Sequence, residues 1–322
     1  MKRAAASLLV ALAGCAAQAP TGAGEPIVVQ GATFVPGPLP GSPPPDGGTP
    51  EDPDGGAESP TVTAITSVNN LFFPGQAGAS YGGDVTDDAT AIAVRFAGLG
   101  TGYWVVVPGP PDATDPGNLT WSMSFGIAAG TPPGPADLLF AAIDATGVSG
   151  SQVDQPVCVD APFPDNFNAC LPSRKPPAAV LSLAWDTPVD LDLLLVAPGG
   201  TVVSSKHPTT NPIVDGGVAP GGGVLDRDSD ANCVPDGRNR EDIVWQDAPA
   251  SGLYLAYANL FSACGKSSVR FTLTLYVPEP VDGGQAMVPK LTQSGELLAI
   301  EANGGASLGL YVADFSFPLS SP

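Results

Sequence analysis

Short apolar segments with a period of two dominate the chain from residue 61 to residue 155. In "LTWSMSFGI" every second residue from Leu119 to Phe125 is apolar, and "AIAVRFAGL" places Ile92, Val94 and Phe96 on one face. This alternation is typical of half-buried strands. Similar runs, "TVTAITSV", "GYWVVVPG" and "ADLLFAAID", are separated by Gly, Pro and Asp turns. Their spacing predicts an antiparallel β-sandwich over residues 61–155.

A second set of alternating segments covers residues 178–280. In "VDLDLLLVAPGGTVV", Leu191, Leu193 and Leu195 share one face, and Asp190 and Asp192 lie on the other. "VLSLAWD", "EDIVW", "GLYLAYANLF" and "SVRFTLTLYV" complete a second antiparallel sandwich. Residues 281–322 are too few for a core of their own, so we expect their strands to pack on this sandwich, with packing between the two sandwiches as the alternative. No window shows a helical period, and the predicted fold class is all-β.

The segment from residue 15 to residue 60 has a different composition. Proline or glycine occupies nearly every second position, and Lys and Arg are absent. Such a chain cannot bury enough apolar surface to offset its ordering entropy. We therefore expect a disordered tether with a reach of about 35 to 140 Å, despite the apolar patches "PIVVQ" and "ATFVP".

The first residues, "MKRAAASLLVALAGCAAQ", have the pattern of a secretory signal. Lys2 and Arg3 precede an apolar run that is too short to span a membrane. The run ends in Leu12-Ala13-Gly14-Cys15, which resembles the lipobox of bacterial lipoproteins. This resemblance implies removal of residues 1–14 and a lipid anchor on Cys15, and Ala16 after it favours the outer membrane or cell surface. An ordinary secretory signal with a chance cysteine is the alternative.

Acidic residues outnumber basic ones. The formal charge is −20, and removing residues 1–14 with their two basic residues would make it more negative. Such a surface repels nucleic acid and anionic head groups and attracts cations, so we expect no nucleic-acid partner.

Four cysteines remain after Cys15. An even number in an exported chain predicts two disulfides, and residues 156–177 form a linker that carries the first. Three pairings are possible, and we favour the one that keeps each bridge within a local unit. The favoured bridges are Cys158–Cys170 and Cys233–Cys264.

Both sandwiches resemble known bacterial domains. The first is similar to bacterial immunoglobulin-like domains, in which a strand ending in "AAIDATG" is common, although it lacks a Cys…Trp…Cys pattern. In the second, "LAWDTPVDLDLLLVAPGG", "LDRDSD" and "REDIVW" resemble secreted β-sandwich domains related to the prepeptidase C-terminal domains found beside secreted hydrolases. That resemblance implies a calcium site. Leu194, where the family often has His, and Asn239-Arg240 before Glu241 depart from the pattern.

The stretch "GVLDRDSDANCVPDG" is a candidate metal site by its own spacing. Asp226, Asp228 and Asp230 stand at positions 1, 3 and 5 of an oxygen-ligand calcium loop. Ala231 and Gly237 replace the glycine and the acid that an EF-hand requires, so the loop is of another kind.

Calcium takes six to eight oxygen ligands, so the loop needs additional donors. Asp190 and Asp192 are the first candidates, and Glu241 and Asp242 are further ones. The alternative is a hydrogen-bonded loop in which aspartates cap turns or pair with Arg227, Arg238 or Arg240. The sequence leaves both open.

Catalysis is not expected. The single histidine, His207, lies in the loop "SSKHPTT", and no nucleophile, phosphate-loop or zinc-protease motif is present. The chain is therefore interpreted as a non-catalytic surface lipoprotein that binds an envelope protein or polysaccharide or has a structural role. A polysaccharide-binding module or an accessory subunit of a secreted hydrolase is the alternative. Candidate sugar-stacking residues are Tyr103, Trp104, Trp245, Tyr254 and Tyr257.

Overall fold

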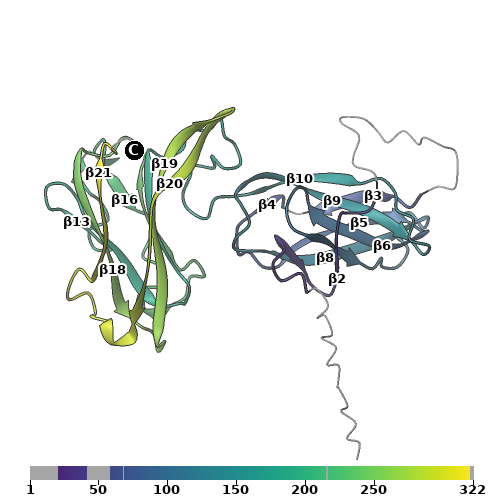
Figure 1. The fold of residues 1–322 in the computed structure, drawn as a ribbon, viewed down its shortest axis with the longest axis horizontal. Coiled ribbons are helices and arrows are strands. Elements are labelled where there is room, and N and C mark those ends of the chain that lie inside the picture. Colours follow the sequence, from purple (N-terminus) through teal and green to yellow (C-terminus); the bar gives the residue numbers. More distant parts are fainter. Residues whose placement is uncertain (1–20, 42–58, 68, 215–216, 320–322) are drawn as a thin grey trace, which may run out of the picture. The chain divides into compact units, whose positions relative to one another are not determined.

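The computed structural model describes residues 21–41, 59–67, 69–214 and 217–319. Across these residues the regular structure is β-strand with two short 3-10 turns, which confirms the all-β fold class. The chain divides into two compact units (Figure 1). The first extends to Pro156, and the second begins at Val157 and includes the short segments 71–74 and 131–136. The proposed signal and Cys15 lie outside the described residues.

Residues 27–159, most of which belong to the first unit, form two sheets. The smaller has the strand order β1-β8-β5-β3, and the larger has the order β2-β7-β6-β9-β10-β4. The pair β4 and β10 is parallel, and its paired residues 71–72 and 158–159 belong to the second unit, so the larger sheet is mixed and not purely antiparallel as expected. The strands are β1 (Ile27–Val29), β2 (Thr33–Pro36), β3 (Val62–Ser67), β4 (Leu71–Phe72), β5 (Ala79–Thr86), β6 (Ala89–Phe96), β7 (Gly102–Val106), β8 (Asn118–Ile127), β9 (Gly134–Asp144) and β10 (Val153–Val159).

Aromatic side chains join the two sheets of the first unit. Trp121 of β8 packs against Phe140 of β9 at 5.3 Å between ring centroids, and Tyr81 of β5 contacts the same ring at 6.2 Å. Trp121 and Phe125, which the alternation places on one face, are both buried. The period-two pattern of the sequence thus gives the core face of β8.

Part of the expected tether is folded, so the prediction of disorder throughout residues 15–60 is wrong. β1 pairs with β8, and β2 pairs with β7. Ile27 and Val29 are buried, and the indole N–H of Trp104 donates to the Ile27 carbonyl at 2.8 Å. The two apolar patches are therefore edge strands, β1 of the smaller sheet and β2 of the larger one. Of the tether expected over residues 15–60, residues 15–20 and 42–58 lie outside the described residues.

The second unit also contains two large sheets. Their strand orders are β16-β17-β11-β19-β20 and β13-β12-β18-β21, and β14 pairs with β15. Strands β20 and β21, from the C-terminal segment, pair with β19 and β18, and β19 and β20 form a long hairpin (Figure 1). The elements are β11 (Ala179–Trp185), β12 (Asp190–Val196), β13 (Val202–Val203), β14 (Ile213–Val214), β15 (Gly217–Val218), β16 (Gly223–Leu225), η1 (Ala231–Cys233), β17 (Arg240–Trp245), β18 (Gly252–Ser262), β19 (Ser268–Val281), β20 (Gly284–Leu298), η2 (Ala299–Glu301) and β21 (Leu310–Phe317).

The core of the second unit lies between these two sheets. Leu191, Leu193 and Leu195 of β12 are fully buried in it, together with Leu181 of β11 and Tyr254 of β18. Burying one leucine side chain contributes on the order of 2 kcal/mol. Because alternate side chains of a strand point to opposite faces, this burial directs Asp190 and Asp192 away from the core.

The two disulfides have the favoured pairing. Cys158 is bonded to Cys170, and Cys233 is bonded to Cys264. The second bridge joins η1 to the turn that follows β18. It therefore fixes the C-terminal side of the acidic stretch to the sheet that carries Asp190 and Asp192.

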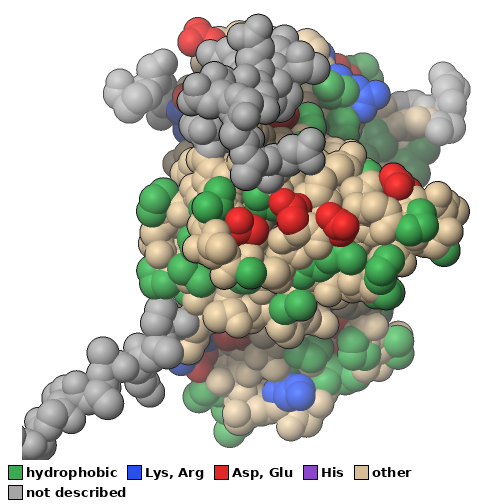
Figure 2. Space-filling view, turned by 90° about the vertical axis from the view of Figure 1, so that its right-hand side faces the viewer, with side chains coloured by type: hydrophobic (Ala, Val, Ile, Leu, Met, Phe, Trp, Pro, Cys, Tyr) green, Lys and Arg blue, Asp and Glu red, His purple; other side chains and the backbone are tan. Residues whose placement is uncertain are grey.

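No helix among the described residues is long and apolar enough to cross a membrane. On the face shown in Figure 2, acidic side chains stand among neutral and hydrophobic ones, and no continuous basic patch is visible among the coloured side chains. This distribution agrees with the formal charge of −20.

Candidate metal centre

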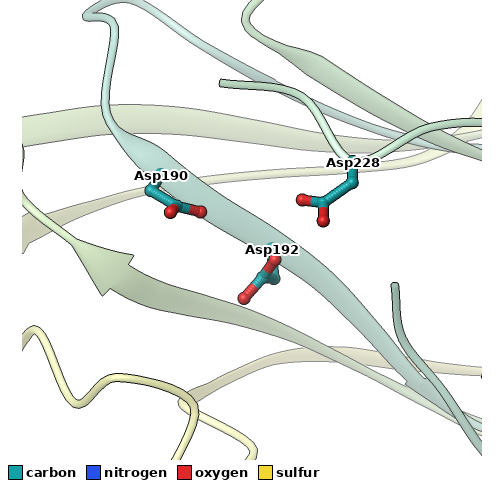
Figure 3. Close-up of side chains that lie close together, drawn as sticks. All are labelled: Asp190, Asp192 and Asp228. Atoms are coloured by element: carbon teal, nitrogen blue, oxygen red, sulfur yellow. The ribbon is translucent and has the colours of Figure 1, made fainter. Parts of the chain in front are cut away.

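Three carboxylates converge on the outer face of β12. Asp190 and Asp192 project from that strand, and Asp228 approaches from the loop after β16 (Figure 3). One carboxylate oxygen from each residue lies within 4.8 Å of the other two. Asp190 is buried, Asp192 is half-buried and Asp228 is exposed, so the cluster lies at the surface with one open side.

The buried carboxylate of Glu241 links the two segments that carry these aspartates. Its Oε2 accepts the backbone N–H of Leu193 at 2.7 Å, and its Oε1 accepts that of Ser229 at 3.1 Å. Leu193 follows Asp192 and Ser229 follows Asp228 in the sequence. Glu241 is therefore a positioning residue behind the cluster, not one of the converging ligands that the sequence allowed.

The acidic loop reaches its position through left-handed backbone. Asp230, Asn232 and Cys233 have φ angles of 58°, 55° and 61°, a region that L-residues other than glycine rarely adopt. The turn brings the N–H of Asn232 to Asp190 Oδ2 at 2.8 Å. This bond, the Glu241 bonds and the Cys233–Cys264 bridge together hold the loop against β12.

Two of the five predicted ligands do not join the cluster. Asp226 pairs with Arg227 at 2.7 Å and accepts the N–H of Asp242 at 2.9 Å. Asp230 is buried and accepts the indole N–H of Trp185 at 3.2 Å and the N–H of Asp236 at 3.0 Å. Asp226 and Asp230 therefore have the hydrogen-bonding role that was the alternative to metal binding. Asp190, Asp192 and Asp228 have the converging arrangement expected of metal ligands.

The carboxylates of the cluster disfavour each other's ionisation. Burial, together with the charges of Asp190 and Asp228, raises the pKa of Asp192 to about 7. Burial is also the main cause of the raised pKa of Asp190, to which Asp228 and Asp230 contribute. Two like charges at this separation repel by roughly 1 kcal/mol in water and more where they are partly buried. A bound cation would reverse this unfavourable balance.

A cavity of ≈ 290 Å³ opens over the cluster. Besides the three aspartates its lining includes Lys206, Asn259 and Phe261. The charge of Lys206 lowers the pKa of Asp192, but among the described residues no ion pair joins Lys206 to the cluster. All lining oxygens are hard donors of the kind that calcium and magnesium prefer, so the residues fit such an ion.

Asn259 is the site residue that sequence reasoning missed. It lies on β18 directly opposite Asp192 in the antiparallel register and is fully buried. The segment "YLAYANLF" gives only a weak signal for this role. Asn259 is the next residue after Tyr257 on the face of the strand that points away from the core, and it carries an amide. Its proximity to Asp192 follows only from the strand register.

Several other expected residues lie away from this centre. Trp104, Trp245 and Tyr254 are buried, so they offer no surface on which a sugar could stack, and Tyr103 and Tyr257 are half-buried. Asp242 is a buried residue of β17, near Arg240, and does not join the cluster. His207 is exposed, and it is not among the residues that line the cavity.

Fold and site define a disulfide-bridged all-β protein with a surface cluster of carboxylates. No family model matches this chain, and no curated protein matches it. Solved structures with partial similarity include the major pilin subunit BcpA of Bacillus cereus (12% identity, 74% of this chain and 67% of that chain, TM-score 0.21). Others are the C-terminal domain of the AgI/II polypeptide BspA of Streptococcus agalactiae (9%, 70% and 94%, 0.22) and dimeric latent PorU of Porphyromonas gingivalis (11%, 75% and 20%, 0.21). TM-scores this low do not establish a shared fold.

Proposed function

We propose that this chain is a non-catalytic lipoprotein of the bacterial cell surface, a binding or structural module whose second unit is stabilised by a calcium ion. The observation that carries the proposal is the convergence of Asp190, Asp192 and Asp228 on one open point. Disulfides are expected in an exported protein, and the two bridges agree with the secretory signal in the sequence.

The cation has a structural role in this proposal. It would connect β12 to the acidic loop through carboxylates that otherwise repel each other. A ligand that binds only the folded state stabilises it by about 2.7 kcal/mol when its concentration is a hundred times its dissociation constant. The cluster lies outside the hydrophobic core, so the ion would add stability to a unit that is already folded.

Calcium titration of the purified chain tests the cation part. Isothermal calorimetry should show one binding site, and the melting temperature should rise with calcium and return to its starting value with chelator. Magnesium, which prefers a rigid octahedron of oxygens and keeps its waters, should bind more weakly. A chain that shows neither heat nor a thermal shift with calcium would contradict the proposal.

Labelling with a fatty acid in an exporting bacterial host tests the anchor. The wild-type chain should carry the label and partition with membranes, and a Cys15→Ala chain should do neither. Turnover of a hydrolase substrate panel by the purified chain would contradict the non-catalytic function, and it would do so whatever the result of labelling.

A further inference from the structure

We infer that Asn259 is a fourth protein ligand of this centre, supplying its amide oxygen from β18 to a hard divalent cation held by Asp190, Asp192 and Asp228. The inference rests on the proposed function, because it concerns the same ion. It adds a neutral oxygen ligand from a strand outside the acidic segments. The spacing of the acidic residues does not reveal this ligand.

The amide of Asn259 is held in one orientation. Its Nδ2 donates to the Ser307 carbonyl, which belongs to the segment that covers this part of β18. Gly309, with φ +82°, lies so close that a Cβ atom there would approach the Asn259 Cα to 2.7 Å. Because the Nδ2 is used in this way, the Oδ1 is the atom left to face other groups.

The Oδ1 of Asn259 has no hydrogen-bond partner, although the residue is 0% exposed. Leaving a buried acceptor unpaired costs about 1–3 kcal/mol, so native structures rarely contain one without a reason. Cross-strand partners in an antiparallel pair project on the same side of the sheet. Asn259 and Asp192 are such partners, and both line the cavity over the cluster.

The unpaired amide oxygen at this position is better suited to bind a metal ion than to accept a hydrogen bond. A carbonyl oxygen is an ordinary ligand for calcium, and it adds a donor without adding a charge. A fourth carboxylate would add to the repulsion among three acids that already disfavour each other's ionisation. A neutral amide oxygen next to them completes more of the coordination shell at no such cost.

Two substitutions separate a ligand from a structural amide. Asn259→Asp keeps an acceptor oxygen but loses the Nδ2 donor to Ser307, and Asn259→Leu loses both groups. If Asn259 is a ligand, Asn259→Asp should bind calcium as tightly as wild type or more tightly, whereas Asn259→Leu should bind at least about tenfold more weakly. If the residue acts only through its bond to Ser307, both variants should weaken binding alike.

The experiment is calorimetric titration of the full chain with calcium, with circular dichroism to show that each variant is folded. Asp226→Asn is the matched control, because it changes an acid of the same stretch that lies outside the cluster. Tight binding by wild type with unchanged affinity in folded Asn259→Leu would overturn this inference and leave the proposed function intact. Absence of binding by wild type would overturn both. If Asn259→Leu does not fold, the inference depends on Asn259→Asp, and weaker binding by that variant would contradict it.

Discussion

Asp190 Oδ2 accepts a hydrogen bond from the backbone N–H of Asn232 at 2.8 Å, which joins β12 to the acidic loop. One oxygen of this carboxylate thus orders the loop, and the side chain still belongs to the converging cluster. Hydrogen bonds within the chain therefore set most of the geometry of the cluster without an ion. A preorganised centre loses less entropy on binding, and its affinity depends on the identity of the few side chains that face the ion.

Replacing Asp228 should remove most of the calcium affinity. Asp228→Asn eliminates one of three charges at the centre, and a loss on the order of ten- to a hundredfold is expected in calorimetric titration. Asp226→Asn, two positions earlier, should bind as wild type because Asp226 is occupied by Arg227 and the N–H of Asp242. Equal losses in the two variants would mean that the overall charge of the loop, and not the converging geometry, attracts the ion.

Calcium binding should weaken as the solution becomes more acidic. Asp192, whose pKa burial raises to about 7, must lose its proton before it can bind a cation. Between pH 8 and pH 6 the proton competes increasingly well, and the apparent affinity should fall by up to about tenfold. Titrations in buffers of different ionisation enthalpy should also show proton release near pH 6.5. An affinity that does not change over this range would show that Asp192 does not take up a proton there.

The stability of the metal-free chain should have a component that decreases as pH rises. Burial raises the pKa of Asp242 to about 7, against the opposing influence of Arg240. Between about pH 4 and 7 the folded state then holds this proton more tightly than the unfolded state, so the unfolding free energy falls with rising pH. Above the folded pKa the loss is complete.

Asp242→Asn isolates this contribution. Urea unfolding with chelator present should show a slope between pH 4 and 7 that is less negative than in wild type by up to about 1.4 kcal/mol per pH unit. Identical slopes in wild type and Asp242→Asn would show that the buried carboxyl does not titrate in this range.

Removing the second disulfide should lower both stability and calcium affinity. Cys233 and Cys264 are 31 residues apart, and a loop of this length corresponds to about 4 kcal/mol in the chain-entropy model. The double variant Cys233→Ser/Cys264→Ser should melt at a lower temperature and bind calcium more weakly, because the bridge holds η1 against β18. The matched Cys158→Ser/Cys170→Ser chain should lose stability but keep its calcium affinity.

The arrangement of β12 could be predicted from the sequence because it depends on a single rule. Three leucines at alternate positions define a core face, and Asp190 and Asp192 must then point outward. The same rule works for β8 in the first unit. It holds wherever one face of a strand is buried and the other faces solvent.

The residues that make up the candidate metal centre could not be predicted in this way. Asp226, Asp228 and Asp230 have identical spacing, yet Arg227 and Trp185 occupy the outer two and only the middle one reaches β12. Asn259 enters through strand register, which the sequence does not give. The strands β1 and β2 could not be predicted from the sequence for a related reason. Each is at most four residues long, within a Pro- and Gly-rich segment, and each is stabilised by distant partners in β8 and β7.

The early strands also shorten the segment between the proposed lipid site at Cys15 and the folded chain. The Glu25 carboxylate accepts the N–H of Thr101 at 3.0 Å, so the chain is fixed to the first unit ten residues after Cys15. Even fully stretched, ten residues span at most about 35 Å. With Cys15 acylated as proposed, the first unit would begin within this distance of the bilayer, so the early strands would shorten the spacer that residues 15–60 were expected to provide.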